Sequence, residues 1–286
     1  MLTLLFDGIA YGMLMFVLAV GLAVTLGLMN FINLAHGAFA MAGGYITALL
    51  MNRLGVPFLA TLPLAFAGTA LLGAVLEPLL YRRMYGKSHL DQVLFSIGLV
   101  FMAIAAVDYF IGSSQQNIHL PAWLEGRFDI AWIGIGKYRL FIIVVCAALA
   151  LGLQWVLSAT RFGSQLRASV DDPRVASGLG LNVNRIFLLT FAVGSGLAGL
   201  GGALGTEILG LDPTFPLKFM IYFLIVVSVG GTSTITGPLL AALLLGVADV
   251  FGKYYVPKLG SFIVYALMVI ILFVRPQGLF VRKGSR

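Results

Sequence analysis

The sequence predicts an all-α fold, a transmembrane helical bundle that crosses the membrane roughly eight to ten times and has broken or re-entrant segments. Of the 286 residues, 60% are hydrophobic and only 10% are charged, and the mean hydropathy is +1.02. Soluble globular domains carry about a quarter charged residues. Apolar runs of spanning length, separated by Gly, Pro or charged residues, recur along the whole chain. We therefore expect one polytopic membrane domain, residues 1–286.

The first apolar stretch must break. Gly8 to Asn52 contains no Asp, Glu, Lys or Arg over 45 residues. As a single helix it would be about 68 Å long, twice the ~30 Å of the hydrocarbon core. The polar island Asn30-Phe-Ile-Asn-Leu-Ala-His-Gly37, followed by Gly43-Gly44, marks the break. Polar side chains at that depth are costly unless they pair with each other, with free backbone groups or with a substrate, so the island is a candidate functional site.

Nine apolar runs are candidate spans. They lie near residues 8–29, 34–52, 57–80, 92–112, 140–158, 186–206, 217–230, 238–252 and 259–275. Lys and Arg gather in the connections 81–91 and 159–185 and in the tail from Arg275, and the positive-inside rule places all three in the cytoplasm. Nine crossings satisfy these placements and put the N-terminus outside.

The connection 113–139 lies on the opposite side. Its aromatic residues, Trp123, Trp132 and Tyr138, favour an element at the outer leaflet interface, and a docking surface for an external partner is the alternative. In the sixth span, Gly194–Gly205 is rich in small residues, which favours close helix packing over substrate contact.

The sequence shows no enzyme machinery. The three histidines lie far apart, Cys146 is the only cysteine, and neither a metal motif nor a nucleophile elbow is present. Gly86-Lys87-Ser88 is not a phosphate-binding loop, because position 81 holds Tyr in place of Gly. The net charge of +7 comes from the connections, so it indicates membrane orientation and not nucleic-acid binding. If transport uses ATP, the nucleotide must bind another chain.

Three acidic residues fall within the apolar runs. Glu77 precedes Arg82 and Arg83, and Asp249 has Lys253 four residues later, so both are expected to form ion pairs near helix ends. Asp108 has no such partner in the sequence. It is the one acidic residue that we keep as a proton-relay candidate.

The connection 159–185 is predicted to hold a short helix. Asp172 is a typical N-cap before Pro173 at the first helical position, and Gly178 and Gly180 favour termination one to two turns later. A helix resting on lipid headgroups is one interpretation, but the mixture of acidic and basic residues favours a surface that faces a protein.

A second polar interruption, Gly230-Gly-Thr-Ser-Thr-Ile-Thr-Gly-Pro238, separates two short apolar runs. Broken segments in both halves are typical of transporters built from repeats, with the substrate route between them. A simple cytoplasmic turn is the alternative, and the orientation of the spans is compatible with it.

On these residues the chain resembles the permease subunits of ATP-binding-cassette (ABC) importers for branched-chain amino acids, within a broader family that includes urea-type and sugar permeases. The resemblance rests on Gly27-Leu-Met-Asn-Phe-Ile-Asn-Leu-Ala-His-Gly37, Arg167–Asn184 and Gly230–Pro238, which occur in the order typical of the family. The Gly230–Pro238 element departs from the family, because several Thr replace the usual Gly and Ser.

The resemblance implies a fold like that of type II ABC importers, in the bacterial inner membrane. It also implies four kinds of partner: a second homologous permease subunit, two cytoplasmic ATPase subunits, a periplasmic solute-binding protein and membrane lipid. ATP and Mg would bind the ATPase subunits, with no cofactor in this chain. The implied translocation residues are Asn30, Asn33, His36, Gly37, Gly43, Gly44, Thr232 and Thr234. The implied ATPase-coupling residues are Arg167, Ala168, Asp171, Asp172, Pro173, Arg174, Gly178 and Gly180.

The mechanism expected from this resemblance is alternating access, with ATPase closure transmitted through the 168–180 helix to spans around the 30–44 break. Three alternatives remain at this point: an ABC permease for urea, amides or other small carboxylates; an ion-coupled secondary transporter or channel that uses Asp108; and a purely structural assembly partner.

Overall fold

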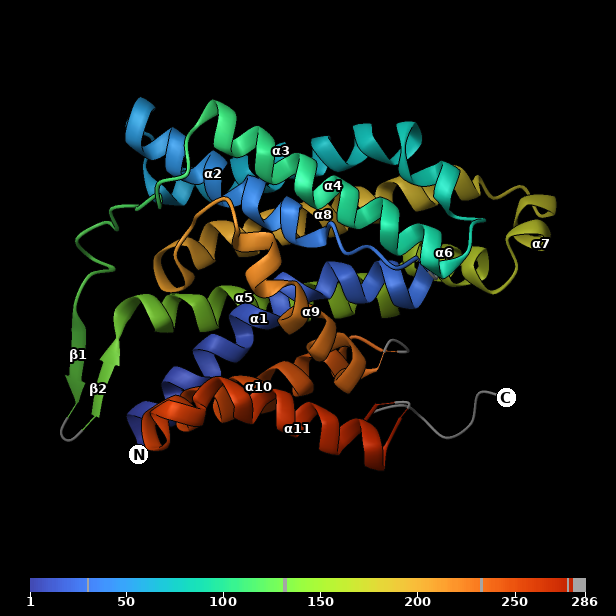
Figure 1. Cartoon of the computed structure of the whole chain (residues 1–286). Helices are drawn as coiled ribbons and strands as arrows, with labels where there is room; N and C mark the ends of the chain where they lie inside the picture. The colour runs from blue at the N-terminus through green and yellow to red at the C-terminus, as the bar shows by residue number, and fades with distance from the viewer. Residues whose placement is uncertain (30, 131–132, 232–233, 277, 280–286) are drawn as a thin grey trace.

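The protein is a bundle of helices, seen in a computed structural model that describes residues 1–29, 31–130, 133–231, 234–276 and 278–279. Figure 1 shows most of the helices running in one common direction, which is the expected membrane normal. The helices are α1 (Leu2–Met29), α2 (His36–Leu54), α3 (Phe58–Leu79), α4 (His89–Phe110), α5 (Lys137–Ala159), α6 (Arg161–Asp171), α7 (Pro173–Gly178), α8 (Val183–Leu209), α9 (Phe215–Gly230), α10 (Thr236–Tyr255) and α11 (Gly260–Val274).

The predicted all-α fold is confirmed. Six of the described helices, α1, α3, α4, α5, α8 and α10, are long and apolar enough to cross a membrane. The helices α9 and α11 are shorter but apolar, and α2 has 19 residues. Each of the nine predicted runs thus corresponds to one helix.

One element was not predicted. Within the 113–139 connection, β1 (Arg127–Ile130) and β2 (Ile133–Gly136) form an antiparallel hairpin. Tyr138 was expected at the membrane interface, but it is buried in the first turn of α5. Its hydroxyl donates to the carbonyl of Leu204 at 2.7 Å. Trp123 is exposed, in agreement with an interfacial position, and Trp132 lies outside the described residues.

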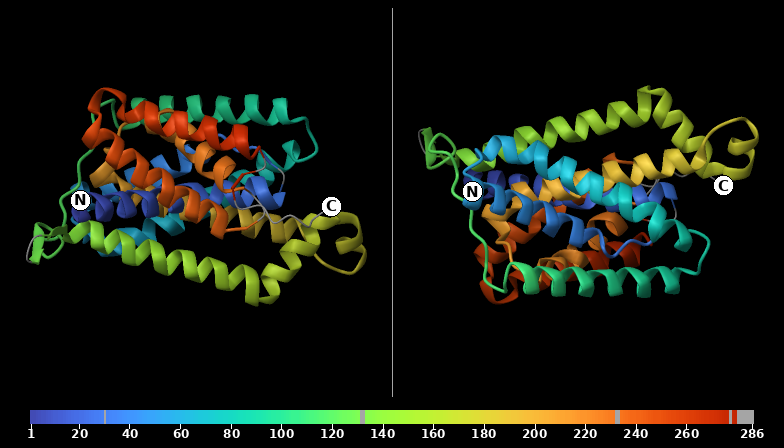
Figure 2. Two further views of the ribbon diagram at one scale, coloured as in Figure 1. Left: turned by 90° about the horizontal axis from the view of Figure 1, so that it is seen from below. Right: turned by 90° about the horizontal axis from the view of Figure 1, so that it is seen from above.

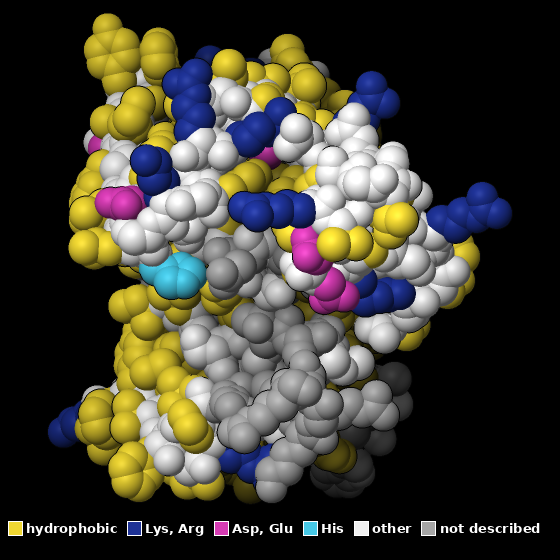
Figure 3. All heavy atoms as spheres, turned by 90° about the vertical axis from the view of Figure 1, so that its right-hand side faces the viewer, with side chains coloured by type: hydrophobic (Ala, Val, Ile, Leu, Met, Phe, Trp, Pro, Cys, Tyr) yellow, Lys and Arg dark blue, Asp and Glu magenta, His cyan; other side chains and the backbone are white. Residues whose placement is uncertain are grey.

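The two ends of the bundle differ in charge. In Figure 1 the turn between α3 and α4, the helices α6 and α7, and the end of α11 lie at one end, whereas the N-terminus and the hairpin lie at the other. Figure 3 shows Lys and Arg side chains spread over the first of these ends. By the positive-inside rule this is the cytoplasmic end, here called the inner end. The arrangement matches the predicted orientation, with an odd number of crossings.

The helices α1 and α8 form the centre of the bundle. Most residues of their apolar segments are buried inside the protein (78% and 72%), against 11% in α4 and 17% in α5. Glycines in α8 allow this packing, because a Cβ at Gly202 would lie 1.8 Å from the carbonyl oxygen of Ala40 in α2. The packing interpretation of Gly194–Gly205 is therefore confirmed. Figure 2 shows α4 and α11 on one side of the bundle and α5 on the opposite side.

Two helix pairs, α1–α2 and α8–α9, are arranged alike but in opposite directions. The helix α1 ends at the inner side, the chain turns back, and α2 starts within the bundle. The helix α8 ends at the outer side, where the carbonyl of Leu211 accepts from the backbone N–H of Gln116 in the outer connection at 2.8 Å. The chain again turns back and α9 starts within the bundle. This is the inverted pattern of broken helices found in many transporters.

The counterpart of the 30–35 break is therefore residues 210–214. Of the two interpretations left open for Gly230–Pro238, the turn is the correct one, because this element joins α9 to α10 at the inner end. Residues 210–214 were not predicted as a break because they are few and apolar apart from Asp212 and Thr214, whereas Gly230–Pro238 has many small polar residues. We call residues 30–35 the first break and residues 210–214 the second break.

Candidate functional site

The first break brings His36 into the interior of the bundle. The imidazole is buried against Gly21 of α1, where a Cβ would lie 2.5 Å from the His36 Cε1 atom. Its Nε2 lies 2.9 Å from the carbonyl oxygen of Leu18. A carbonyl can only accept, so Nε2 carries the proton in this contact. Gly21 is eight residues, about 12 Å, before the end of α1, so α2 starts well inside the bundle.

Asn33 has an unsatisfied polar atom in the same break. Its side chain is buried, and among the described residues its Oδ1 has no hydrogen-bond partner. Its backbone carbonyl accepts from the N–H of His36 at 3.2 Å. A buried amide oxygen without a partner is costly, so this acceptor is available for a donor that the structure does not contain. Asn30 lies outside the described residues.

Sequence reasoning missed Gln92, which holds the first break in place. Its Oε1 accepts from the backbone N–H of Ile32 at 3.1 Å, and its Nε2 donates to the carbonyls of Met84 and Lys87 at 3.4 and 3.3 Å. Gln92 thus joins the break to the turn between α3 and α4. A polar residue at the start of an apolar run was the only available signal, and its partners are far away in the sequence.

Aromatic rings connect the same break to α8. Phe31 packs edge-on against Tyr81 and Tyr85, with ring centroids 5.6 and 5.5 Å apart. Tyr81 in turn contacts Phe191 at 4.5 Å, and Tyr85 contacts Phe187 at 5.9 Å. Phe187 and Phe191 lie in the inner half of α8, so a displacement of this half of α8 would also displace the rings that pack on Phe31 in the first break.

The helices that follow the two breaks, α2 and α9, meet at Gly37. A Cβ at Gly37 would lie 3.1 Å from the Cα atom of Pro216, in the first turn of α9. Gly44 lies beside Thr206 near the outer end of α8, and Gly37 is two turns, about 10 Å, further inward along α2. Both α2 and α9 therefore start deep within the bundle, and their first turns touch.

Two other predicted translocation residues lie in helix contacts. A Cβ at Gly43 would be 2.1 Å from the carbonyl oxygen of Gly199, and one at Gly44 would be 2.9 Å from the side chain of Leu211. This placement indicates close packing of α2 on α8 and on the second break. It leaves no room for a substrate at these two glycines.

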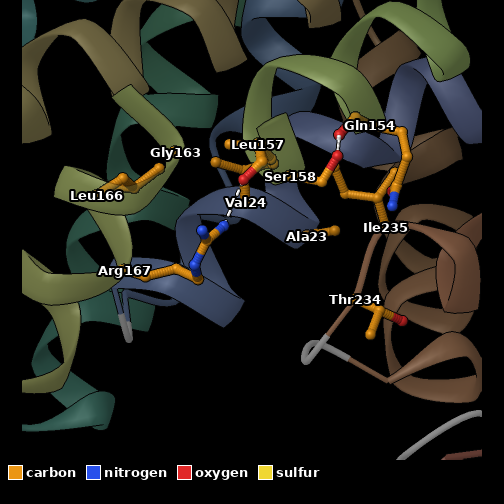
Figure 4. Close-up of a pocket in the computed structure, with 10 residues that line it drawn as sticks. All are labelled: Ala23, Val24, Gln154, Leu157, Ser158, Gly163, Leu166, Arg167, Thr234 and Ile235. Atoms are coloured by element: carbon orange, nitrogen blue, oxygen red, sulfur yellow. Dashed lines mark hydrogen bonds between the residues drawn. The ribbon is translucent and has the colours of Figure 1, made fainter. Parts of the chain in front are cut away.

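Thr234, a predicted translocation residue, lies in the turn before α10, where its hydroxyl accepts from the backbone N–H of Gly237 at 3.3 Å. Figure 4 shows Thr234 and Arg167 on opposite sides of an open cavity of about 180 Å³, lined by α1, α5, α6 and this turn. Thr232 lies outside the described residues. Tertiary structure thus places Thr234 beside the predicted coupling residues, at the inner end.

The predicted short helix exists as α7, capped as expected. Oδ1 of Asp172 accepts from the backbone N–H groups of Arg174 and Val175 at 2.9 and 3.0 Å, and Pro173 is its first residue. The helix ends at Gly178, and Gly180 has φ of +87°, a conformation that favours glycine.

Among the predicted coupling residues, Arg167 makes a contact with a neighbouring helix, and the others are exposed. Arg167 donates to the carbonyl of Leu157 at the end of α5, and so fixes α6 to that helix. The remaining residues are exposed on α6, α7 and the turn that follows: Ala168, Asp171, Asp172, Pro173, Arg174, Gly178 and Gly180. The apolar side chains of Val175 and Leu179 are exposed beside them. This combination suits a docking surface for another protein.

The expected ion pairs are present. Nη2 of Arg82 lies 2.7 Å from Oε2 of buried Glu77, and Nζ of Lys253 lies 2.6 Å from Oδ2 of Asp249. The hydrogen bond from Arg82 to Glu77 raises the pKa of the guanidinium, which therefore stays charged. Asp108 is exposed near the outer end of α4, and no ion pair forms on it among the described residues.

Comparison with known proteins gives the family. A family profile described as "Branched-chain amino acid transport system / permease component" matches residues 4–272. The chain belongs to this family. It is therefore a multi-pass membrane permease and not an enzyme, and the ATPase and solute-binding components of such ABC importers are separate chains.

Relatives match along nearly the whole chain. The permease protein BraD of Pseudomonas aeruginosa, of a high-affinity branched-chain amino acid transport system, is 28% identical over 96% of this chain and 94% of its own. The permease protein LivH of Escherichia coli K12, of a system with the same description, is 25% identical with the same coverage. A probable LivH of Methanocaldococcus jannaschii is 27% identical over 95% of this chain and 90% of its own. No solved structure matches.

Proposed function

We propose that this permease carries branched-chain amino acids through the cell's inner membrane as one of two homologous permease subunits. Two cytoplasmic ATPase subunits would bind ATP and Mg, and a solute-binding protein would deliver the ligand from outside. The similarity to BraD and LivH along nearly the whole chain supports this substrate class. The contact between Gly37 and Pro216, where two inverted broken helices meet, supports a transport route beside it.

The route in this proposal passes the start of α2. Asn33, with its unpartnered Oδ1, and the free N–H groups of the first turn of α2 would receive part of the substrate, helped by the helix dipole. His36 holds α2 against α1 through Leu18. Gly37 allows α9 to come within contact distance. The route needs no charged side chain at the first break.

The helices α6 and α7 form the coupling element of this proposal. The ATPase subunits would dock on the exposed residues from Ala168 to Gly180. Their movement would pass through α6 to α5 by the Arg167–Leu157 contact, and through α7 to α8. In α8, Phe187 and Phe191 would transmit it to Tyr85 and Tyr81, and so to the first break.

Reconstitution of the complete importer in proteoliposomes tests the proposal. With external solute-binding protein and internal ATP, we expect uptake of L-leucine, L-isoleucine and L-valine but not of urea. Asp172→Ala with Pro173→Ala should lower uptake about tenfold by uncapping α7, while ATP hydrolysis by the free ATPase subunits stays unchanged.

The matched control is Asp91→Ala, which removes an exposed carboxylate near the N-terminus of α4 at the same inner end and should leave uptake unchanged. Uptake of urea in place of the amino acids would contradict the substrate class. Full coupling in the Asp172/Pro173 double variant would contradict the role of α7.

A further inference from the structure

The second break carries an ion pair that the proposed transport route does not use. Lys218, in the first turn of α9, donates to Oδ2 of Asp212. The other oxygen of Asp212, Oδ1, accepts from the backbone N–H and the hydroxyl of Thr214 at 2.8 and 2.5 Å. The carboxylate is thus held in a fixed orientation by its own loop. The ammonium of Lys218 has three donors, and among the described residues it uses one, on Asp212.

The ion pair lies where the second break leads into α9. The neighbouring residue Leu211 packs on Gly44 of α2, and its carbonyl accepts from the backbone N–H of Gln116 in the outer connection. Pro216, two residues before Lys218, lies on Gly37, about 10 Å further inward along α2. Charged groups between the helices of a membrane protein are expensive unless they face protein or a water-filled cavity, and they are functional candidates for that reason.

The pair is nevertheless accessible. The side chain of Lys218 is 55% exposed and that of Asp212 is 21% exposed. Thr214, Leu217 and Ile221 are exposed on the same face of α9. Both charges therefore reach the surface of the protein at the start of α9.

A second polar group points to a ligand here. The side chain of Tyr45 on α2 is only 3% exposed, and its hydroxyl has no hydrogen-bond partner among the described residues. Tyr45 follows Gly44, which packs on Leu211, the residue before Asp212, so this hydroxyl is on the segment of α2 that contacts the second break.

We propose that Asp212 and Lys218 bind the charged backbone of a zwitterionic amino acid on its way through the permease. The α-carboxylate binds the free donors of Lys218, and the α-ammonium binds Asp212, with the Tyr45 hydroxyl as a further partner. The inference rests on the proposed function, because it assumes that the permease carries amino acids. It also adds what that proposal lacks, which is a residue that recognises the two charges common to them.

The geometry explains why an ion pair suits this task. Without substrate, Asp212 and Lys218 neutralise each other, so neither charge is left unpaired. A zwitterion brings one charge of each sign, so its binding leaves the net charge of the site unchanged. A solute with only one charge would leave either Lys218 or Asp212 unpaired. The site would select against such solutes, because an unpaired charge at Lys218 or Asp212 weakens their binding.

The alternative is an ion pair that only stiffens the start of α9. A control pair of similar make-up is present in Asp249 and Lys253 of α10, where the lysine is 49% exposed. Nζ of Lys253 also lies 5.6 Å from the ring of Tyr11, in a pair that is distant in the sequence from the second break. Substitution of Lys253 measures the effect of losing an ion pair at a position outside the proposed binding site.

A cysteine-labelling experiment tests the proposal in the complete importer. Cys146 is buried, so Cys146→Ala provides a background without reactive thiols. Leu217→Cys then places a maleimide-reactive thiol next to Lys218. We expect millimolar L-leucine to slow labelling about tenfold, and leucinamide and 4-methylpentanoate, which each lack one charge, to protect far less. Adding Lys218→Met or Asp212→Asn should abolish protection, whereas Lys253→Met should keep it. A thiol at Leu259→Cys, exposed near the outer end, should not be protected.

Uptake of leucine, measured in the same proteoliposomes, separates this inference from the proposed function. Leucine uptake without protection at position 217, or protection that survives Lys218→Met, overturns the site alone. Protection by leucine without uptake supports the site and contradicts the proposed function. Absence of both contradicts both. Equal protection by leucinamide and leucine overturns the assignment of Lys218 to the carboxylate.

Discussion

The two breaks occupy equivalent places in an inverted arrangement, yet their environments are opposite. The first is sealed: His36 and Asn33 are buried, Gln92 binds its backbone, and aromatic rings surround Phe31. The second is open: Asp212, Thr214 and Lys218 are charged or polar and reach the surface. Each is followed by a helix that starts inside the bundle, α2 after the first break and α9 after the second. The difference indicates that the repeat supplies the geometry, while the side chains give each break a separate role.

If the two breaks depend on their contact, a wider residue at Gly37 should have the largest effect. Gly37→Val places its side chain against the backbone of Pro216, which cannot move without shifting α9. Overpacking of this kind costs about 1–3 kcal/mol, and uptake should fall more than tenfold. Thermal unfolding in detergent and leucine uptake measure the two effects.

The control for Gly37 is Gly152→Val in α5, where nothing lies within 4 Å of the new Cβ. It should change neither the melting temperature nor uptake by much. Equal melting temperatures for the two variants would show that α2 and α9 do not rely on contact at Gly37.

The sealed character of the first break predicts a stability effect at His36. His36→Ala removes the imidazole donor to the carbonyl of Leu18 and opens a cavity beside Gly21. We expect a loss of about 2–3 kcal/mol of unfolding free energy. His36→Gln, which keeps a donor at similar reach, should recover most of it. Denaturation in mixed micelles measures both, and equal losses would argue against the Leu18 hydrogen bond.

Gln92 sharpens the comparison, because among the described residues the second break is joined to a distant segment by a backbone hydrogen bond, from Gln116 to Leu211, and not by a side chain. Gln92→Leu removes the acceptor for the N–H of Ile32, so hydrogen exchange at residues 31–35 should become about tenfold faster. Exchange at 211–214 should not change. Exchange that is unaltered at both breaks would contradict the anchoring role.

The open character of the second break predicts the smallest effect on stability. The Asp212–Lys218 pair is half exposed through its lysine, so solvent screening leaves it about 0–1 kcal/mol. Lys218→Met should therefore melt within a few degrees of the wild-type protein and lose leucine protection, whereas Lys253→Met, which leaves buried Asp249 unpaired, should melt at a lower temperature and keep the protection. A large drop in melting temperature for Lys218→Met alone would assign the pair a structural role.

Local chemistry made several features predictable. Charge-free length required a break after α1, and Asn33 and His36 are the polar residues that the structure buries there. Asp172, Pro173 and Gly180 predicted the limits of α7, because caps and positive φ are properties of a few adjacent residues. The ion pairs of Glu77 and Asp249 followed from spacing within one helix and its end. Roles in translocation and coupling remain proposals.

The sequence by itself determined the membrane class, the nine apolar helices, their orientation and the first break, since each depends on hydropathy, charge or neighbouring residues. Tertiary structure decided which segments correspond. It moved Thr234 to the inner end beside Arg167, made Gly43 and Gly44 packing positions, and revealed the second break with Asp212 and Lys218. The physical reason is that depth in the bundle depends on how distant helices pack. Gly37 and Pro216 are 179 positions apart in the sequence, and only their contact shows that the two breaks meet.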